Sequence, residues 1–308
     1  MSCPRRSRPA TAEDVARDGH RFAWLKPDGW REGFRALVLE IEEGGDGTWR
    51  VIGVGRIGAS TVHPRRDLVE LEIDPAHRRQ GHGTALLREL GRYSNNPLSS
   101  KVAPGSERDL FLRSLGAVTY LPVPLLSVHA AAERTERWCA AVCEAADGDV
   151  QLVRLGELPR ADVADALADR YHWQHASWSP TASRDVLVSE VGASIVENSV
   201  LELSWATLRE GRITALLDVY DEPVGPVREA CVEAVDASEP TARLDVALCL
   251  AAALEGLCDL GVTHLDLDNH PTDPHAAPLL ATLDPVEKDP VHLVEIPNGL
   301  TSRLRDLG

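Results

Sequence analysis

A chain of 308 residues is long enough for two ordinary domains, and its 44% of hydrophobic residues can form a core in each. No apolar run reaches the length of a membrane span and no apolar segment follows the basic N-terminus, so we expect a soluble, cytoplasmic protein without a secretory signal. The net charge of −16 divides into +3 for residues 1–137 and −19 for residues 138–308, which argues against nucleic acid as a ligand and suits a cationic small molecule, although solubility alone explains it equally well.

The first half of the chain alternates helices and strands after a basic segment, residues 1–9, which we expect to be a disordered arm. Hydrophobic periodicity and turn residues predict three helices, at 10–18, 85–90 and 107–115. The same signals predict five strands, at 34–42, 49–59, 68–73, 98–103 and 118–123. A helix at 133–146 is expected to link this half to the next, and we place the domain boundary at 137/138.

The most informative stretch is residues 68–90, where an apolar strand leads through Asp74-Pro75 into Arg78-x-x-Gly81-x-Gly83 and then into a leucine-rich helix. The free N–H groups and partial positive charge of a helix start favour an anion. Glycines let a phosphate approach the backbone, and a nearby arginine adds a charge-assisted contact. The stretch therefore predicts a phosphate-binding turn.

Neither the G-x-G-x-x-G dinucleotide fingerprint nor the G-x-x-x-x-G-K-[ST] loop is present in this stretch. The pattern instead resembles the acyl-CoA-binding motif Q/R-x-x-G-x-G/A of the GCN5-related N-acetyltransferase (GNAT) superfamily, filled here by Arg78, Gly81 and Gly83. A purely structural strand-to-helix turn is the alternative. The resemblance implies an α/β (α+β) fold whose central sheet is mixed, mostly antiparallel and flanked by helices.

The resemblance also implies acetyl-CoA as co-substrate and a set of residues that bind it. The backbone N–H of Ile73 would polarise the thioester carbonyl, as a small oxyanion hole does, and the Arg78 side chain would lie near the phosphates. The pyrophosphate would be held by the backbone N–H groups of the loop, which consists of Arg78, Arg79, Gln80, Gly81, His82, Gly83 and Thr84.

Three carboxylates on or beside the strand are candidates for the base that deprotonates an amine. Asp67 occupies the position where several family members carry one, whereas Glu70 and Glu72 have the opposite parity and are expected to face elsewhere unless a bulge intervenes. The general acid is missing from its usual place, because the position four residues before Gly116 is Leu112 rather than tyrosine. Ser106 and Tyr120 are nearby substitutes.

The second half repeats the element order of the first. Helices are predicted at 160–171, 186–198 and 244–260, and strands at 151–155, 200–208, 213–220, 228–235, 264–267 and 291–296. A gapless alignment places Pro240, Arg243 and Asp245 opposite Arg78, Gly81 and Gly83. A carboxylate repels a pyrophosphate, so we interpret residues 138–308 as a degenerate GNAT-like domain and residues 1–137 as the domain that binds acyl-CoA.

Two polar clusters in the second half have competing interpretations. The side chains of His172, Trp173, His175 and Trp178 suit either a ligand wall or, more simply, domain packing. The loop residues Asp266, Asp268, Asn269, His270, Asp273 and His275 include metal-binding types, but their spacing matches no defined site, so we expect a solvated loop and no metal. The six cysteines form no C-x-x-C pair, which indicates buried, reduced thiols.

These observations predict a tandem GNAT protein that transfers an acetyl group from acetyl-CoA to a primary amine of a small, cationic acceptor. The alternatives are a non-catalytic acyl-CoA-binding protein and an acyltransferase that uses a larger acyl donor in secondary metabolism. We expect no nucleic-acid or membrane partner, and the sequence leaves a homodimer open. Because arginine far outnumbers lysine, the composition is typical of a high-GC bacterial genome.

Overall fold

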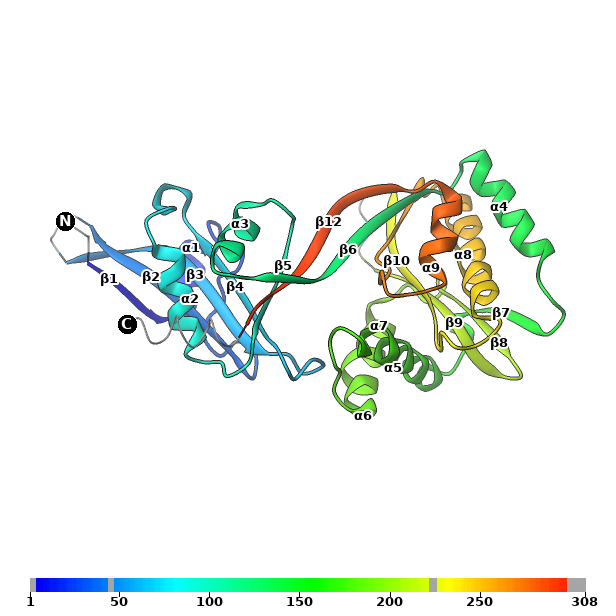
Figure 1. Cartoon of the computed structure of the whole chain (residues 1–308), viewed down its shortest axis with the longest axis horizontal. Helices are drawn as coiled ribbons and strands as arrows, with labels where there is room; N and C mark the ends of the chain where they lie inside the picture. The colour runs from blue at the N-terminus through cyan, green and yellow to red at the C-terminus, as the bar shows by residue number, and fades with distance from the viewer. Residues whose placement is uncertain (1–3, 44–46, 222–225, 298–308) are drawn as a thin grey trace. The chain divides into compact units, whose positions relative to one another are not determined.

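The computed structural model describes residues 4–43, 47–221 and 226–297, and the chain forms two compact units (Figure 1). The first unit comprises the chain up to Tyr120 and again from Leu293, and the second runs from Leu121 to His292. These bounds differ from the predicted domains 1–137 and 138–308, whose boundary falls inside helix α4 (Glu133–Glu144). The units differ from the predicted domains because the end of the chain returns to the first unit, a long-range event without a local sequence signal.

The first unit is an α/β sheet in the neighbour order β1-β2-β3-β4-β5-β12. Strands β1 to β4 pair antiparallel, whereas β4 and β5 pair parallel. Its elements are β1 (Arg5–Pro9), α1 (Ala12–Asp18), β2 (Phe34–Glu43), β3 (Thr48–Ala59), β4 (Asp67–Ile73), α2 (His82–Gly91), β5 (Leu98–Val102), α3 (Glu107–Ser114) and the start of β6 (Val118–His129).

The basic N-terminal segment is ordered from Arg5 onward, which corrects the expectation of a disordered arm for its described part; residues 1–3 lie outside the described residues. β1 pairs antiparallel with β2, and its arginines neutralise two carboxylates buried beneath it. Arg8 contacts Asp14 at 2.6 Å and Glu40 at 2.7 Å, and these carboxylates are only 1% and 3% exposed. A buried carboxylate needs a cationic partner, so the arginines of β1 are required at this position.

Helix α2 covers one face of the first sheet. Its buried residues Leu86, Leu87 and Leu90 pack with the odd-numbered residues of β4, namely Val69, Leu71 and Ile73. A second cluster lies on the opposite face of the sheet and includes Val38 of β2, Val54 of β3, and Phe22 and Leu25 of the segment after α1. The alternation of side chains along a strand thus separates an α2 face from an α1 face.

The last strand of the chain, β12 (Val286–Ile296), ends in the core of the first unit. Val294 and Ile296 are each 1% exposed and belong to the same buried cluster as Leu98 and Val102 of β5. Between them, Glu295 forms an ion pair with Arg66 at 2.6 Å. The core of the N-terminal unit is therefore completed by residues nearly 200 positions away, at the C-terminus.

The second unit has the neighbour order β6-β11-β10-β9-β8-β7 and repeats the element order of the first. β11 pairs antiparallel with β6, the last strand of the first repeat, while β12 of the second repeat lies next to β5. The two repeats have therefore exchanged their final strands. The elements after α4 are β7 (Val150–Arg154), α5 (Arg160–Ala176), α6 (Arg184–Leu187), a π-turn (Val188–Gly192), α7 (Ala193–Asn198), β8 (Trp205–Arg209), β9 (Arg212–Val219), β10 (Val227–Ala234), α8 (Ala242–Asp259), β11 (His264–Leu267) and α9 (Ala276–Leu280).

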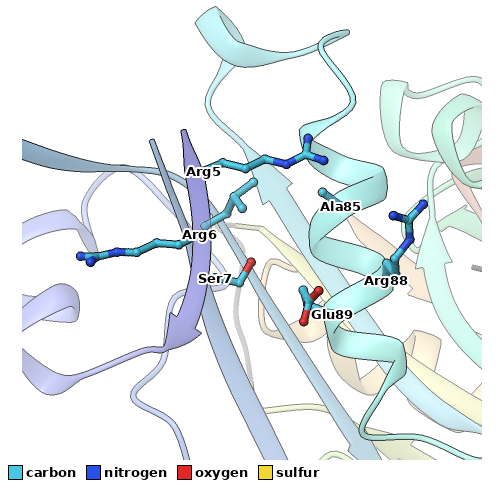
Figure 2. Close-up of a pocket in the computed structure, with 7 residues that line it drawn as sticks. Arg5, Arg6, Ser7, Ala85, Arg88 and Glu89 are labelled. Atoms are coloured by element: carbon cyan, nitrogen blue, oxygen red, sulfur yellow. The ribbon is translucent and has the colours of Figure 1, made fainter. Parts of the chain in front are cut away.

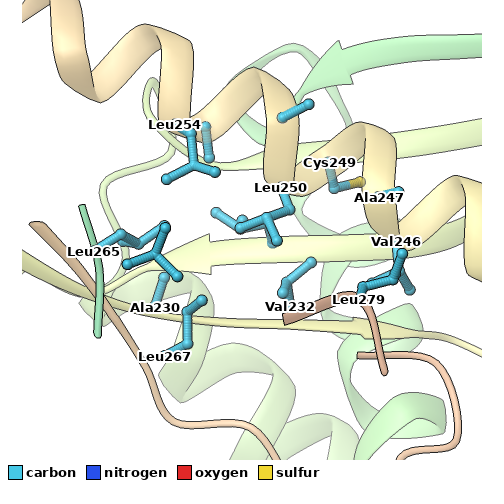
Figure 3. Packing of buried hydrophobic residues seen from close by; sticks show 14 of the residues in the cluster. Ala230, Val232, Val246, Ala247, Cys249, Leu250, Leu254, Leu265, Leu267 and Leu279 are labelled. Atoms are coloured by element: carbon cyan, nitrogen blue, oxygen red, sulfur yellow. The ribbon is translucent and has the colours of Figure 1, made fainter. Parts of the chain in front are cut away.

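The core of the second unit lies under α8 (Figure 3). Leu250 and Leu254 of this helix are fully buried above Val232 of β10 and Leu265 of β11. Burial of one such side chain contributes about 1.5–3 kcal/mol, so α8 is the main stabilising element of this sheet. Within the described residues, no helix combines the length and apolar character that crossing a membrane requires.

Two element predictions need correction. The strand predicted at 200–208 is shorter, because residues 201–203 form a turn before β8 begins at Trp205. The helix predicted at 186–198 is interrupted by the π-turn, which ends at Gly192. A Cβ atom at Gly192 would lie 2.2 Å from the carbonyl oxygen of Ala164, so this glycine allows α5 to approach closely.

Candidate active site

The predicted phosphate loop joins β4 to α2 as a tight, glycine-dependent turn. After the short turn Pro75–His77, Arg79 has φ +61° and Gly81, the N-cap of α2, has φ +79°. The first helical bond runs from the Ala85 N–H to the Gly81 carbonyl oxygen at 3.1 Å. The N–H groups of His82, Gly83 and Thr84 precede that bond and form the open end of the helix, where an anion is favoured.

Arg78 stabilises this loop with its side chain. Its Nε donates to the carbonyl oxygen of Ile73 at 2.9 Å, and its guanidinium pairs with Glu107 at the start of α3. In this geometry Arg78 ties the loop to the strand end and to α3. The contacts that the loop offers to an anion are therefore those of its backbone N–H groups.

The two glycines of the motif have different structural roles. Nothing lies within 4 Å of the position that a Cβ atom of Gly81 would take, so this residue is required for its positive φ. A Cβ atom at Gly83 would lie 3.3 Å from the ring of Phe111. Gly83 therefore permits the close approach of α2 to α3, a role that the motif pattern did not reveal.

The loop lies in a positively charged environment. Burial, together with the charges of Arg5 and His77, lowers the pKa of His82, so its imidazole is neutral at pH 7. A pocket of about 300 Å³ beside α2 is lined by Arg5, Arg6 and Ser7 of β1, Leu39, and Ala85, Arg88 and Glu89 of α2 (Figure 2). In Figure 2 the Arg5 side chain extends from β1 toward α2, adding positive charge on this side of the helix.

Strands β4 and β5 diverge just before the loop. Their parallel pairing is confined to Asp67 with Leu98 and Leu68 with Ser99, whereas β4 stays paired with β3 along its whole length. The backbone N–H of Asp74 donates to the carbonyl oxygen of Ile52, on the β3 side. The backbone N–H of Asp67 donates to the carbonyl oxygen of Pro97, on the β5 side. By alternation, the N–H groups of residues 69, 71 and 73 point into the gap between β4 and β5. The Ile73 N–H thus points into this gap, and its role toward a thioester stays a prediction.

Glu70 and Glu72 lie together on the α1 face of β4. The Nε of Arg56 donates to Glu70 Oε2 at 2.7 Å, and the Ala23 N–H donates to Glu72 Oε2 at 3.0 Å. The Arg56 guanidinium also lies 4.7 Å from the ring centre of Trp24. The segment after α1 therefore places the Trp24 ring against Arg56 and a backbone N–H against Glu72.

Asp67 lies apart from these two carboxylates. It has the parity of the α2 face, is 7% exposed, and accepts hydrogen bonds from Ser94 and from the Asn96 side chain, the latter at 3.1 Å. Both partners belong to the turn after α2. The structure therefore brings Glu70 and Glu72 together and separates Asp67 from them, and it gives Asp67 a role in holding this turn.

A tyrosine lies on the same face as the two glutamates. The Tyr120 hydroxyl is 2.8 Å from Ser99 Oγ, and Ser99 pairs with Leu68, the last β4 residue before the strands part. Arg66 lies over the Tyr120 ring at 4.2 Å, and burial raises the pKa of the phenol above its usual value. Leu112, the usual position of the acid, is 1% exposed and packs in the core.

Sequence reasoning missed Arg56 and Trp24 and ranked Tyr120 only as a substitute. The parity of β4 and its pairing with β3 at Arg56 would have placed Arg56 beside Glu70, but the strand register was not evident from the sequence. The position of Tyr120 depends on the pairing of separate strands, for which no local signal exists.

In the corresponding turn of the second unit, a buried carboxylate lies beside the helix start. The residue before helix α8 is Thr241, and the residue before helix α2 is Gly81. The structure therefore matches Gly81 with Thr241, whereas the gapless alignment paired Gly81 with Arg243. Asp245, in the first turn and fully buried, accepts hydrogen bonds from Arg209 Nη2 at 2.8 Å and from Thr241 Oγ1 at 2.9 Å. A carboxylate so close to the helix start repels an anion there, which supports the interpretation that this turn is degenerate.

Comparison with known proteins agrees with this geometry. Residues 7–102 match the model of the acetyltransferase (GNAT) family. Among solved structures, a tandem GNAT protein from the clavulanic acid biosynthesis pathway is 16% identical with a TM-score of 0.61, and the match covers 96% of this chain and 99% of that chain. A GCN5-related N-acetyltransferase from Sphaerobacter thermophilus is 13% identical with a TM-score of 0.60, covering 96% and 97%.

A third similar structure is a GCN5-related glucosamine N-acetyltransferase region of a fungal multi-domain β-N-acetylglucosaminidase, which is 12% identical with a TM-score of 0.64 and covers 96% of this chain and 38% of that chain. No curated protein matches the chain. The predicted resemblance and fold class are confirmed: residues 7–102 match the GNAT family model, and the whole chain has the fold of a tandem GNAT protein. This family generally uses acetyl-CoA as co-substrate, and the comparisons support acyl transfer in general.

Proposed function

We propose that the first unit transfers an acetyl group from acetyl-CoA to the primary amine of a small, cationic acceptor. The observation that carries the proposal is the opening between β4 and β5 beyond Leu68 and Ser99, which leads directly to the loop 78–84. An extended thioester arm can lie in such a gap and pair with exposed strand N–H groups, while its pyrophosphate occupies the helix start.

In this proposal the reaction occurs at the closed end of the gap. The N–H groups of residues 69, 71 and 73, which point into the gap, polarise the thioester carbonyl, because fixed donors stabilise the negative charge that develops on its oxygen. Of the two predicted bases on the α1 face, Glu70 is nearer to the closed end, two residues or about 7 Å along the strand from Leu68. Glu70 accepts the proton of the acceptor ammonium group, and Arg56 holds its carboxylate in place.

Tyr120 serves as the general acid, because Leu112 occupies the position of the usual tyrosine. Its hydroxyl lies on the Glu70 face beside Ser99, and its raised pKa keeps the proton in place at neutral pH. The thiolate of CoA leaves at this end of the gap and takes up the phenolic proton. Trp24 and Trp30 flank the Arg56 guanidinium that holds Glu70, and the two glutamates supply negative charge that attracts a cationic acceptor.

Turnover tests the proposal. Release of free CoA thiol is measured with acetyl-CoA and a panel of polyamines, aminosugars and basic amino acids. We expect Glu70→Gln to lower kcat by about 100-fold or more, since general-base catalysis contributes 10²–10⁴-fold. Asp67→Asn is the matched control, and we expect it to lower stability while leaving the pH dependence of kcat unchanged.

The Tyr120→Phe variant tests the acid separately. We expect kcat to fall about tenfold or more with little change in the dissociation constant of acetyl-CoA, because the hydroxyl acts on the leaving group. Binding of acetyl-CoA measured by calorimetry without turnover of any amine would favour the alternative of a non-catalytic binding protein. Absence of acetyl-CoA binding would refute the proposal as a whole.

A further inference from the structure

The second unit contains a pair of histidines that neither the fold nor the proposed reaction explains. His175 lies at the C-terminal end of α5 and His270 lies in the loop after β11, and their Nε2 atoms are 3.2 Å apart. The Nδ1 of His175 is 2.7 Å from the carbonyl oxygen of Tyr171, and the Nδ1 of His270 is 2.9 Å from Glu233 Oε1.

These contacts determine where the ring protons lie. A carbonyl oxygen and a carboxylate oxygen can only accept, so each histidine carries its proton on Nδ1 and donates it to its own acceptor. Although burial opposes it, the Glu233 carboxylate raises the pKa of His270. A proton on one Nε2 joins the two rings by a hydrogen bond. When both rings are neutral, the two Nε2 lone pairs face each other at 3.2 Å, and a metal ion can take the place of that proton.

The distance matches two ligands of one metal ion. Imidazole nitrogens bind zinc at about 2.0–2.1 Å in tetrahedral geometry, which separates two ligand nitrogens by about 3.3 Å. We propose that His175 Nε2 and His270 Nε2 form a binding site for one divalent transition-metal ion of the zinc class. Water completes the coordination, since the His270 side chain is 23% exposed.

The surroundings of the pair are those of a built site. A histidine that binds a metal typically donates its other N–H to a carboxylate or a backbone carbonyl, which orients the ring, and both rings do so here. His175 is 4% exposed and lies between Tyr171, with ring centres 3.7 Å apart, and Trp178, at 4.6 Å. The backbone N–H of His270 also donates to Glu233 Oε1, at 2.9 Å.

The charges beneath the pair favour a cation. Arg170 and Asp218 form a buried ion pair at 2.5 Å that is neutral as a unit. Glu233, 1% exposed, lies 3.9 Å from Arg170 Nε and is the additional negative charge of this cluster. A cation held between the two Nε2 atoms balances that charge.

Another donor set in this region, Cys231, Glu233 and His270, has ligand atoms within 4.8 Å of one another. It fits a metal less well than the histidine pair does. Glu233 Oε1 already accepts two hydrogen bonds from His270, and Arg170 faces the other carboxylate oxygen. A divalent ion at that position would have to displace these donors and approach a guanidinium.

Calorimetry on the full chain, cleared of metal with a chelator and titrated with zinc chloride, tests the proposal. We expect one equivalent of zinc to bind and the dissociation constant to rise at least tenfold in His175→Ala and in His270→Ala. His172→Ala is the matched control on the same helix, where the side chain is exposed and bonds to Thr181, and it should bind zinc as the wild type does.

Copper on the wild-type protein provides a measurement that requires no variant. We expect the electron paramagnetic resonance spectrum to show two coordinated imidazole nitrogens, and zinc to displace the copper. The proposal is overturned if the wild type binds no zinc, if His175→Ala binds it equally well, or if nitrogen magnetic resonance shows a proton shared between the rings in zinc-containing buffer.

Discussion

Gly81 and Gly83 occupy neighbouring positions in the loop but are required for different reasons. Gly81 adopts a left-handed conformation in open space, and Gly83 lies against the Phe111 ring. A side chain at the first position strains the backbone, whereas a side chain at the second displaces α3. The two substitutions should therefore respond differently to a change at Phe111.

We expect Gly83→Ala to lower the free energy of unfolding by about 1–2 kcal/mol, because its Cβ would press on Phe111. Adding Phe111→Leu should recover part of that loss, with a coupling of about 0.5–1 kcal/mol between the two sites. Urea unfolding of the four proteins measures the cycle. Gly81→Ala with Phe111→Leu is the control, and an equal coupling there would contradict the packing role of Gly83.

Asp14 stabilises the first unit through Arg8 and through a capping box with Thr11. The hydrogen bond from Arg8 is the largest of the effects that hold the pKa of Asp14 well below its usual range. Because the pKa is lower in the folded than in the unfolded state, this stabilisation is complete above pH 4 and is lost as the pH falls further.

Asp14→Asn should therefore lower the free energy of unfolding by about 2–3 kcal/mol at pH 7. The expected loss is less than for a fully buried pair, since the Arg8 side chain is 30% exposed. Denaturant unfolding of wild type and variant at pH 7, 5, 4 and 3 should show the difference shrinking only at the most acidic values. A difference that is the same at every pH would contradict the ion-pair origin.

At the scale of elements, β12 belongs to the second repeat in sequence and to the first unit in structure. Ile296→Ala should destabilise the first unit by about 2–4 kcal/mol, because the side chain is 1% exposed in a packed cluster. Tryptophan fluorescence during urea unfolding measures the change. Val286→Ala, 66% exposed on the same strand, is the matched control and should change stability by less than about 0.5 kcal/mol.

The opening between β4 and β5 is also a property of elements. Both strands continue, β4 to Ile73 and β5 to Val102, yet their pairing stops after Leu68 and Ser99. The loop, the gap and the carboxylates on the α1 face are arranged by the register of β4 with β3, in which Arg56 lies opposite Glu70. A shift of one residue would turn both glutamates to the α2 face.

At the scale of the whole molecule, the exchange of final strands makes each repeat depend on the other. A fragment of residues 1–137 lacks Val294, Glu295 and Ile296, so it exposes apolar surface of β5 and leaves Arg66 without its carboxylate. We expect this fragment to unfold at a lower urea concentration than the same unit in the full chain.

Adding a peptide of residues 286–297 in excess should raise the stability of the fragment, since a ligand that binds only the folded state stabilises it. A peptide of the same composition in scrambled order is the control. If the fragment alone unfolds at the same urea concentration as the full chain, β12 is dispensable for the first unit and the role assigned to it is incorrect.

Local patterns were sufficient to predict the loop, most helices and strands, and the tandem arrangement. The alternation of apolar residues in β4, the glycines before α2 and the leucines within it are each visible over a few residues. The degenerate character of the second loop also followed from local chemistry, because Asp245 lies close to the helix start and repels an anion there.

The remaining features join residues that are far apart in the chain. β1 is ordered because Asp14 and Glu40 are buried, β12 completes the core of the other repeat, and Tyr120 reaches Ser99 across separate strands. His175 and His270 were each noted as polar residues, but 95 positions separate them and only folding brings their Nε2 atoms together. Short-range periodicity indicates which face of a helix or strand is buried. It does not indicate which elements pack together, because long-range strand pairs stabilise the chain only once the sheet has assembled.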